Sequence, residues 1–232
     1  RTGGGGARGF KGWSTVLPAS GVGGPQARRR ALIIGSRLFD PSILVPPRKT
    51  HYNPNGKGQQ INLPFDSKEY LSEPQPWKNT KDAIGDLLPP EGTETRDVSP
   101  PLNLHFGRNP TELSKKRYRV VSKEGMNRFD LQRIAPELTP KCWLRKKTGG
   151  TDLFGRLWWD RPAFTIRTEF FKPEKGRYLH PTQHRPITHR EAARFQTFPD
   201  DFVFKGSKIE IAKQIGNAVP PLLAARIADV VY

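Results

Sequence analysis

The clearest helical spacing of apolar and polar positions lies toward the end of the chain. Thr188 precedes an apolar run at helical spacing, and Glu191 follows three residues later. Such a pair forms a capping box, because the Thr hydroxyl and the Glu carboxylate each satisfy a free backbone N–H group at the start of a helix. Ser207 and Glu210 repeat the arrangement before the run KIEIAKQI. The pattern predicts two helices, the first of which is stopped by Pro199.

A third helix is predicted at the C-terminal end. Gly216–Asn217 breaks the second helix, and Pro220–Pro221 can open the next one, because Pro is tolerated in a first turn. Leu223, Ile227 and Val230 recur at helical spacing, and we interpret them as packing residues.

The first ninety residues carry weaker patterns. Residues 1–24 are Gly-rich and are predicted to be irregular, whereas Ala31–Gly35 is a short apolar run that predicts a buried strand. Residues 40–76 contain Pro-Pro, Asn-Pro and Asn-Gly pairs, which are typical of loops. The run NTKDAIGDLLPP predicts a short helix capped by Asn79 or Thr80.

Residues 91–183 form a mixed, basic segment rich in aromatic residues. The runs KKRYRVV, CWLRKKTGG, FGRLWWDRPAFTIRTEFF and KGRYL predict short strands with turns between them. We interpret Trp158 and Trp159 as packing residues rather than as platforms for stacked bases.

The charge balance narrows the class of partner. The formal net charge is +17 for 232 residues, and the pI is about 10.3. A surplus of this size favours a polyanion, and nucleic acid is the expected one because no apolar run is long enough to cross a bilayer. Charge alone leaves open a merely soluble basic protein or one bound to ribosomes.

The chain has one cysteine, Cys142, so it forms no internal disulfide and no cysteine-rich zinc site. No metal site is expected, and an intracellular location is the natural inference. The sequence begins at Arg1 rather than Met, and RTGGGGARGF lacks the apolar core of a signal peptide. We therefore expect a piece of a longer protein.

Two motifs near the C-terminus carry a family resemblance. RPITHREAARFQTFP fits R-x-x-T-x-R-E-x-x-R-x-Q-x-F-P, and QIGNAVP fits Q-x-G-N-x-V-P. Upstream, GPQARRRALIIGSR provides a Gln-x-Arg-x-Arg block before a strand, and FGRLWWDRPAFTI precedes the C-terminal motifs. In this order the four segments resemble the cytosine-5-specific DNA methyltransferases. Residues 40–157 carry little of the resemblance.

The resemblance implies an α/β fold. It implies the C-terminal part of a Rossmann-like methyltransferase domain together with a small, irregular, mostly β target-recognition domain. The expected divisions are residues 1–90 for the end of the catalytic domain, 91–184 for the recognition domain and 185–232 for helices returning to the catalytic domain.

The implied reaction is methylation of C5 of a cytosine flipped out of duplex DNA, with S-adenosylmethionine as methyl donor. A Cys thiolate adds to C6 of the ring, which is covalent catalysis. Gln26, Arg28 and Arg30 occupy the Gln-x-Arg-x-Arg positions and are the expected catalytic residues. Arg30 is expected to touch the cytosine and stabilise its developing charge, and Arg28 to support the site.

Other roles follow from the same resemblance. Asn217 and Ala218 are expected to line the S-adenosylmethionine pocket, whereas Arg190, Glu191 and Arg194 are expected to form a structural polar network. Thr165 matches a family residue that lies near the DNA phosphate beside the flipped base. The positive charge around it adds Arg167, Arg156, Lys146 and Lys147 to the expected DNA contacts. Gly149 and Gly150 are expected to allow close approach of the backbone to DNA, with a plain turn as the alternative.

The sequence departs from the family at its nucleophile. Cys142 lies in TPKCWL, not in a Pro-Cys-Gln context, and the Glu-Asn-Val and Phe-x-Gly-x-Gly blocks are missing. We therefore expect the chain to be inactive alone, either as the C-terminal part of a single-chain enzyme or as the second subunit of a split one. A non-catalytic DNA-binding relative is the alternative. The expected setting is cytoplasmic and nucleoid-associated, within a restriction–modification system.

Overall fold

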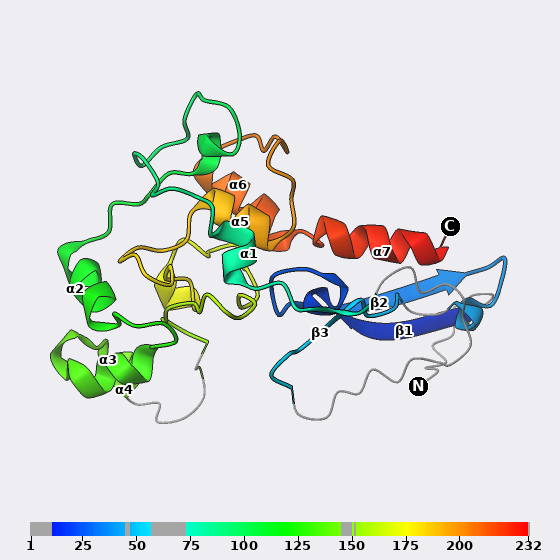
Figure 1. Ribbon diagram of the computed structural model, residues 1–232, viewed down its shortest axis with the longest axis horizontal. Helices are drawn as coiled ribbons and strands as arrows, with labels where there is room; N and C mark the ends of the chain where they lie inside the picture. The colour runs from blue at the N-terminus through cyan, green and yellow to red at the C-terminus, as the bar shows by residue number, and fades with distance from the viewer. Residues whose placement is uncertain (1–10, 45–46, 57–72, 145–149, 151, 232) are drawn as a thin grey trace.

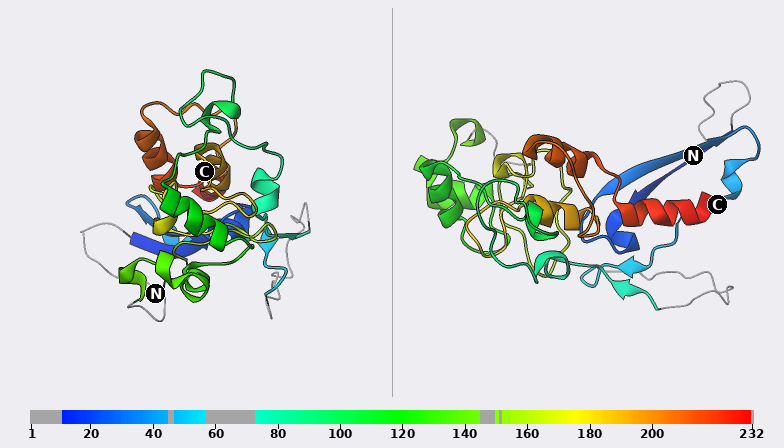
Figure 2. Two further views of the ribbon diagram at one scale, coloured as in Figure 1. Left: turned by 90° about the vertical axis from the view of Figure 1, so that its left-hand side faces the viewer. Right: turned by 90° about the horizontal axis from the view of Figure 1, so that it is seen from above.

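The computed structural model describes residues 11–44, 47–56, 73–144, 150 and 152–231. The predicted DNA contacts Lys146, Lys147 and Gly149 lie outside the described residues. The molecule is elongated, as Figures 1 and 2 show. A hairpin and the last helix form one end, three short helices form the other, and a helical core lies between them.

The hairpin consists of β1 (Lys11–Pro18) and β2 (Arg29–Ser36), paired antiparallel from Lys11 opposite Ser36 to Pro18 opposite Arg29. The prediction that residues 1–24 are irregular is therefore wrong for β1. The sequence KGWSTVLP contains Thr15 and Val16, whose β-branched side chains favour an extended strand. Pairing with β2 supplies the backbone hydrogen-bond partners of this strand. The 3₁₀ turn η1 (Ala19–Val22) follows β1, and η2 (Pro41–Ile43) follows β2.

Only one face of the hairpin is covered by the described residues. α7 (Pro221–Val231) runs alongside it (Figure 1), and Leu223 packs with Leu17 and Val22. The other face is open, and Ile33 is 76% exposed. The prediction of a strand at Ala31–Gly35 is confirmed, but its predicted burial is wrong, because a two-stranded ribbon with one helix buries a single face.

The connection to the core contains little regular structure. β3 (His51–Tyr52) and β4 (Gln75–Pro76) pair in parallel over two residues each. α1 (Thr80–Ile84) follows, capped by Asn79, whose side chain accepts from Asp82 N while Asp82 reciprocates. The predicted short helix and its Asn79 cap are confirmed.

The central core is built on α5 (His189–Phe195) and α6 (Lys208–Asn217). Both capping boxes are present as predicted, with Thr188 and Glu191 at α5 and with Ser207 and Glu210 at α6. The largest apolar cluster joins residues from α1, α5, α6 and the irregular segments around them. Its fully buried members include Ile166, Phe170, Ala192, Phe195 and Ile215.

The predicted recognition segment is not mostly β in the described residues. It holds α2 (Glu112–Val120), α3 (Arg128–Ile134) and α4 (Lys141–Leu144). The 3₁₀ turns are η3 (Leu102–Leu104), η4 (Pro136–Leu138) and η5 (Pro173–Lys175). Extended pairing is limited to isolated bridges such as Arg156 with Leu179.

The run KKRYRVV belongs to α2, so its prediction as a strand is wrong. Thr111 caps the helix by accepting from Ser114 N. Tyr118 and Val121 are buried three residues apart, which is a helical spacing, and they pack in a second cluster with Leu131. The divisions 1–90, 91–184 and 185–232 remain predictions, since the central cluster draws on all three ranges.

Candidate functional site

Gln26 lies at the point where the hairpin meets the central core. Its side chain is completely buried. The amide Nε2 donates to Phe195 O at 2.9 Å and to Gln196 Oε1 at 2.6 Å, and the amide oxygen accepts from Ile166 N at 3.2 Å. A parallel bridge with Ala163 fixes the backbone beside it. Gln26 therefore joins the predicted catalytic block to the segment of the predicted DNA contact Thr165.

Arg28 extends the same junction toward α6. Its guanidinium donates from Nη1 to Ile166 O at 2.7 Å and from Nη2 to Gly216 O at 3.0 Å. The side chain is buried, and its Nε has no hydrogen-bond partner among the described residues. The structure thus brings the Gln-x-Arg-x-Arg block and the Gln-x-Gly-Asn block together. In this arrangement Gln26 and Arg28 position backbone segments rather than face an open site.

Gly216 fits the junction because it lacks a side chain. A Cβ atom at this position would lie 2.3 Å from Thr168 N and 2.5 Å from the Arg167 carbonyl carbon. Gln196 Nε2 donates to Ile215 O at 2.6 Å, one residue earlier. The end of α6 is therefore held directly against the backbone that follows Thr165.

Arg30 differs from its two neighbours in the block because it is only half-buried. It pairs across the hairpin with Leu17, and Leu17 is buried against α7. Cross-strand partners project from the same face of a sheet. Arg30 therefore lies on the face that α7 covers, whereas Arg29 lies exposed on the opposite face.

The predicted cofactor contacts lie in the link between α6 and α7. Asn217 is exposed and Ala218 is half-buried with an extended backbone, φ −56° and ψ 148°. An exposed amide and an extended peptide are hydrogen-bonding groups open to a ligand. The chemistry of these two residues is therefore compatible with the predicted cofactor contact.

Arg190 and Arg194 tie α5 to loops that are distant in the sequence. Arg190 donates to Pro101 O at 3.0 Å and to Asn103 Oδ1 at 3.0 Å. Arg194 binds Asp200 through two parallel hydrogen bonds of 2.9 and 2.6 Å. The Asp200 carboxylate raises the pKa of the Arg194 guanidinium above its ordinary value.

Glu191 belongs to a separate polar group inside the core, with Arg185 and Thr188. Arg185 donates two hydrogen bonds to its carboxylate, at 2.8 and 2.6 Å. Burial alone would raise the pKa of the Glu191 carboxyl, but the Arg185 guanidinium holds it below its usual range. Glu191 is therefore an ion-paired anchor for the start of α5.

Thr165 and Arg167 lie together beside the junction. They line a small cavity of about 50 Å³, and Tyr178 OH donates to Thr165 O at 3.0 Å. Arg167 remains exposed and pairs with Asp152 at 3.0 Å. Gly150 adopts the left-handed conformation with φ +64° and accepts from Arg128 Nε at 3.2 Å.

Arg156 is completely buried, so its predicted contact with DNA is wrong. Its guanidinium donates to the carbonyl oxygens of Val121, Tyr118, His180 and Gln183. Burial lowers the pKa of Arg156 to about 10. The residue holds α2 and the segment around His180 together.

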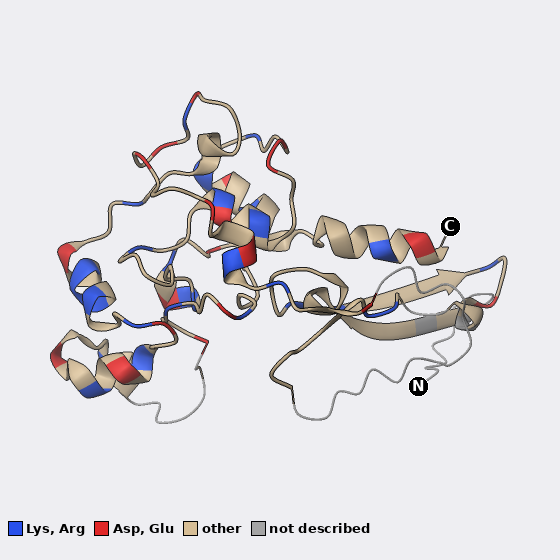
Figure 3. Ribbon diagram, in the orientation of Figure 1, with Lys and Arg blue, Asp and Glu red and all other residues tan. Residues whose placement is uncertain are grey.

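The α2 helix carries exposed positive charge on one face, which the prediction of a strand here did not indicate. Lys116 and Arg119 are exposed, and Figure 3 shows basic residues concentrated on this helix. Residues three apart lie on one helix face, so the two side chains are neighbours. A helical interpretation of KKRYRVV would have found this face.

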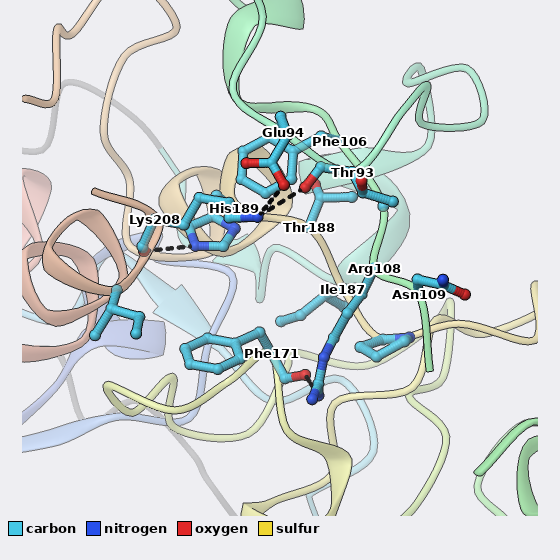
Figure 4. A pocket seen from close by; sticks show the side chains of 13 residues that line it. Thr93, Glu94, Phe106, Arg108, Asn109, Phe171, Ile187, Thr188, His189 and Lys208 are labelled. Carbon is cyan, nitrogen blue, oxygen red and sulfur yellow. Dashed lines mark hydrogen bonds and ion pairs between the residues drawn. The ribbon is translucent and has the colours of Figure 1, made fainter. Parts of the chain in front are cut away.

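A separate apolar cavity of about 290 Å³ lies where α5 and α6 begin (Figure 4). Phe106, Phe171 and His189 form its walls. Its charged rim is already engaged, since Lys208 Nζ binds Glu94 at 2.6 Å and Arg108 Nη1 donates to Phe171 O at 2.7 Å. None of the residues predicted from the sequence as site residues lines this cavity.

The described part of the chain holds no group of three His, Cys, Asp or Glu side chains suited to a metal ion. Within the same residues, no helix combines the length and apolar character that a bilayer-spanning segment needs.

The arrangement resembles that of a known methyltransferase structure. The chain aligns with the crystal structure of a protein described as a DNA modification methyltransferase encoded within an E. coli prophage. The TM-score is 0.56 at 18% identity, over 96% of this chain and 60% of the other. This likeness is one of fold, and it places the mixed α/β chain among proteins with a methyltransferase fold.

The sequence profile of the C-5 cytosine-specific DNA methylases matches residues 7–232. The chain therefore belongs to this family. It is 32% identical to the type II methyltransferase M1.HphI of Haemophilus parahaemolyticus, over 96% of this chain and 48% of the relative. It is 51% identical over 79 residues to the DNA (cytosine-5)-methyltransferase PliMCI of Paracentrotus lividus, which covers 32% of this chain and 5% of the relative. The chain thus spans about half the length of M1.HphI.

Proposed function

We propose that the chain is the DNA-recognition and C-terminal portion of a DNA (cytosine-5-)-methyltransferase. The protein would transfer the methyl group of S-adenosylmethionine to C5 of a cytosine flipped out of duplex DNA. The observation that carries this proposal is the junction at which Arg28 binds both Ile166 O and Gly216 O. It brings together the three segments that we assign to the cytosine, to the DNA and to the cofactor, and this chemistry needs those groups side by side.

The DNA-binding part of the proposal rests on charge and exposure. The net charge of +17 supplies long-range attraction to the phosphate backbone. Thr165 and Arg167 lie together at the junction, and Lys116 and Arg119 extend the basic surface along α2. We assign Thr165 and Arg167 to phosphates next to the flipped cytosine, and the α2 pair to phosphates farther along the duplex.

In this proposal the methyl donor and the target cytosine bind at neighbouring segments of the same junction. S-adenosylmethionine supplies an electrophilic methyl group when it is bound. Asn217 and Ala218 would hold it through the amide and backbone groups that they leave open. Arg30 would stabilise negative charge on the cytosine ring through its guanidinium.

The attacking thiolate is assigned to residues outside this sequence. Cys142, the single cysteine, is exposed on α4, in the predicted recognition segment. The open face of the hairpin is the proposed docking surface for the part that carries the thiolate. This face, which we call the open hairpin face, consists of Gly12, Ser14, Val16, Ala31, Ile33 and Gly35, and the exposed Arg29 stands at its end.

Two measurements test the proposal. The codons preceding Arg1 should encode, in frame or in an adjacent gene, a Pro-Cys-Gln segment followed by Glu-Asn-Val. The assembled protein should then convert cytosine to 5-methylcytosine in duplex DNA with labelled S-adenosylmethionine, detected by mass spectrometry of the nucleosides. Duplex binding without 5-methylcytosine in the assembled protein would instead identify a non-catalytic DNA-binding relative. The type II relatives motivate a search for a neighbouring restriction nuclease gene.

A further inference from the structure

A cavity of about 570 Å³ opens between the 53–55 turn and the segment 158–164. Its position is fixed from both sides by backbone hydrogen bonds. Trp77 N donates to Tyr52 O at 2.8 Å, and Ala27 N donates to Ala163 O at 2.8 Å. The cavity is thus part of the folded framework that holds the junction.

Trp158, Phe164 and Arg161 line one side of the cavity, and Arg177 packs against Trp158 from outside the lining. The Arg161 guanidinium lies 4.7 Å from the centre of the Trp158 ring, and the Arg177 guanidinium lies 4.4 Å from it. Arg177 is buried, whereas the Arg161 side chain is 56% exposed and makes a single long ion pair of 3.9 Å with Asp160. Arg161 therefore presents a planar cation, held by Trp158, to the cavity.

The opposite wall offers hydrogen-bonding groups and a further ring. Asn53 Oδ1 accepts from Asn55 N at 3.0 Å, which leaves the Asn53 amide NH₂ as a donor, and the Asn55 side chain is exposed. Trp77, half-buried, lies in the same wall. A planar ring with polar edges would find both stacking surfaces and amide partners in this space.

The cavity adjoins the proposed DNA-contacting residues. Phe164 lines it and also lines the small cavity formed by Thr165 and Arg167. A nucleic acid that lies across Thr165 would therefore bring its bases within reach of Trp77 and Arg161.

We propose that this cavity is a stacking subsite for a nucleobase of the bound DNA other than the target cytosine. The base would stack on Trp77 or on the Arg161 guanidinium and turn its polar edge toward Asn53 and Asn55. This inference rests on the proposed function, because it requires DNA at Thr165. A base held here would anchor the duplex next to the flipped cytosine.

The test compares two duplexes with the same phosphate charge, one carrying a single bulged 2-aminopurine and the other an abasic bulge. We expect the full-length protein to bind the first about tenfold more tightly, as expected for one stacked base. The fluorescence of the bulged base should be quenched on binding. Trp77→Ala and Arg161→Ala should each reduce the affinity ratio toward one, whereas Trp77→Phe should retain most of it.

Two further variants separate stacking from charge. Arg161→Lys keeps the positive charge, so the salt dependence of binding should persist while the ratio falls. Arg133→Ala removes an exposed arginine of α3 outside the cavity and should leave the ratio unchanged. If the protein binds and methylates duplex DNA but Trp77→Ala and Arg161→Ala leave the affinity ratio unchanged, the subsite alone is overturned. No binding to either duplex by the unaltered protein would overturn the proposed function as well.

Discussion

Arg28 and Gly216 are separated by 188 residues in the chain, and a hydrogen bond of 3.0 Å joins the guanidinium of one to the carbonyl oxygen of the other. The same guanidinium reaches Ile166 O at 2.7 Å. A charged donor that bridges two buried carbonyls is worth more than a neutral hydrogen bond, and its loss leaves both acceptors unpaired. The hairpin block, the segment around Ile166 and the end of α6 are therefore held together at one point.

Replacing Gly216 with Ala tests how tightly this point is packed. The new methyl group would lie 2.3 Å from Thr168 N, a backbone atom that cannot turn away. We expect Gly216→Ala to lower the free energy of unfolding by about 3 kcal/mol, as overpacking against a fixed neighbour does. Urea denaturation followed by circular dichroism measures this change.

Gly12→Ala is the matched control for this substitution. The nearest atom to its added methyl group is Ile34 O at 4.0 Å, so the methyl group has room. Its unfolding midpoint should stay close to that of the unaltered protein. Equal midpoints for Gly216→Ala and Gly12→Ala would show that the backbone around Thr168 shifts to admit the methyl group. Gly216 would then not fix the geometry of the junction.

Arg30 is the residue through which the proposed chemistry is most directly tested. In the assembled enzyme, Arg30→Ala should reduce methyl transfer about a hundredfold, the scale of one lost charge-stabilising donor. Binding of duplex DNA should change far less, because the proposed phosphate contacts at Thr165, Arg167 and α2 remain. Single-turnover rates and binding titrations give the two quantities.

Arg133→Ala serves as the control, since Arg133 is an exposed arginine of α3, outside the hairpin. It removes the same charge from a position that the proposal does not use and should leave the rate unchanged. Parallel losses of rate and affinity in Arg30→Ala would assign Arg30 to a phosphate rather than to the cytosine ring.

Local signals in the sequence predicted the starts of α1, α5 and α6. The Thr188 and Ser207 caps are made by side chains three residues from their partners, so the pattern contains the whole interaction. The break before α7 is likewise local. The meeting of Gln26 and Arg28 with Gly216 is not local, and only the family resemblance indicated it.

The failed predictions concern residues whose environment is set by tertiary partners. Arg156 was expected to contact DNA because it lies in a basic run, yet four carbonyl oxygens that converge in the fold enclose it. The β-branched and aromatic residues of KKRYRVV favour a strand, but the Thr111 cap and the packing of Tyr118 and Val121 select a helix. Neither the local charge nor the secondary-structure propensity of a segment indicates which distant residues will pack against it.

Two buried histidines should make the central core sensitive to mild acid. Burial lowers the pKa of both His180 and His189 from 6.5 to about 4. Geometry agrees, since His180 Nδ1 accepts from the backbone N–H groups of Thr182 and Gln183 and so carries no proton. Protonation is therefore easier in the unfolded chain, and stability falls as the pH drops below 6.5 toward 4.

Between pH 7.5 and 5.5 the loss should be roughly 1.4 kcal/mol for each histidine, before most carboxylates begin to titrate. Urea midpoints at the two pH values measure it. His189→Gln removes one titrating group, so the difference between the two pH values should shrink by roughly 1.4 kcal/mol. A difference that His189→Gln leaves unaltered would assign the acid sensitivity to other groups.

The open hairpin face gives the last prediction. Ile33 is 76% exposed in this chain, so Ile33→Asp should leave the stability of the chain alone nearly unchanged. In the full-length or assembled protein the same carboxylate would be buried against the catalytic part, at a cost of roughly 2–4 kcal/mol. We expect a lower melting temperature in a single-chain enzyme, or loss of co-purification in a split one. Leu88→Asp, at a position that is 74% exposed and outside this face, should have neither effect. Assembly of Ile33→Asp as tight as that of the unaltered protein would show that the catalytic part docks elsewhere.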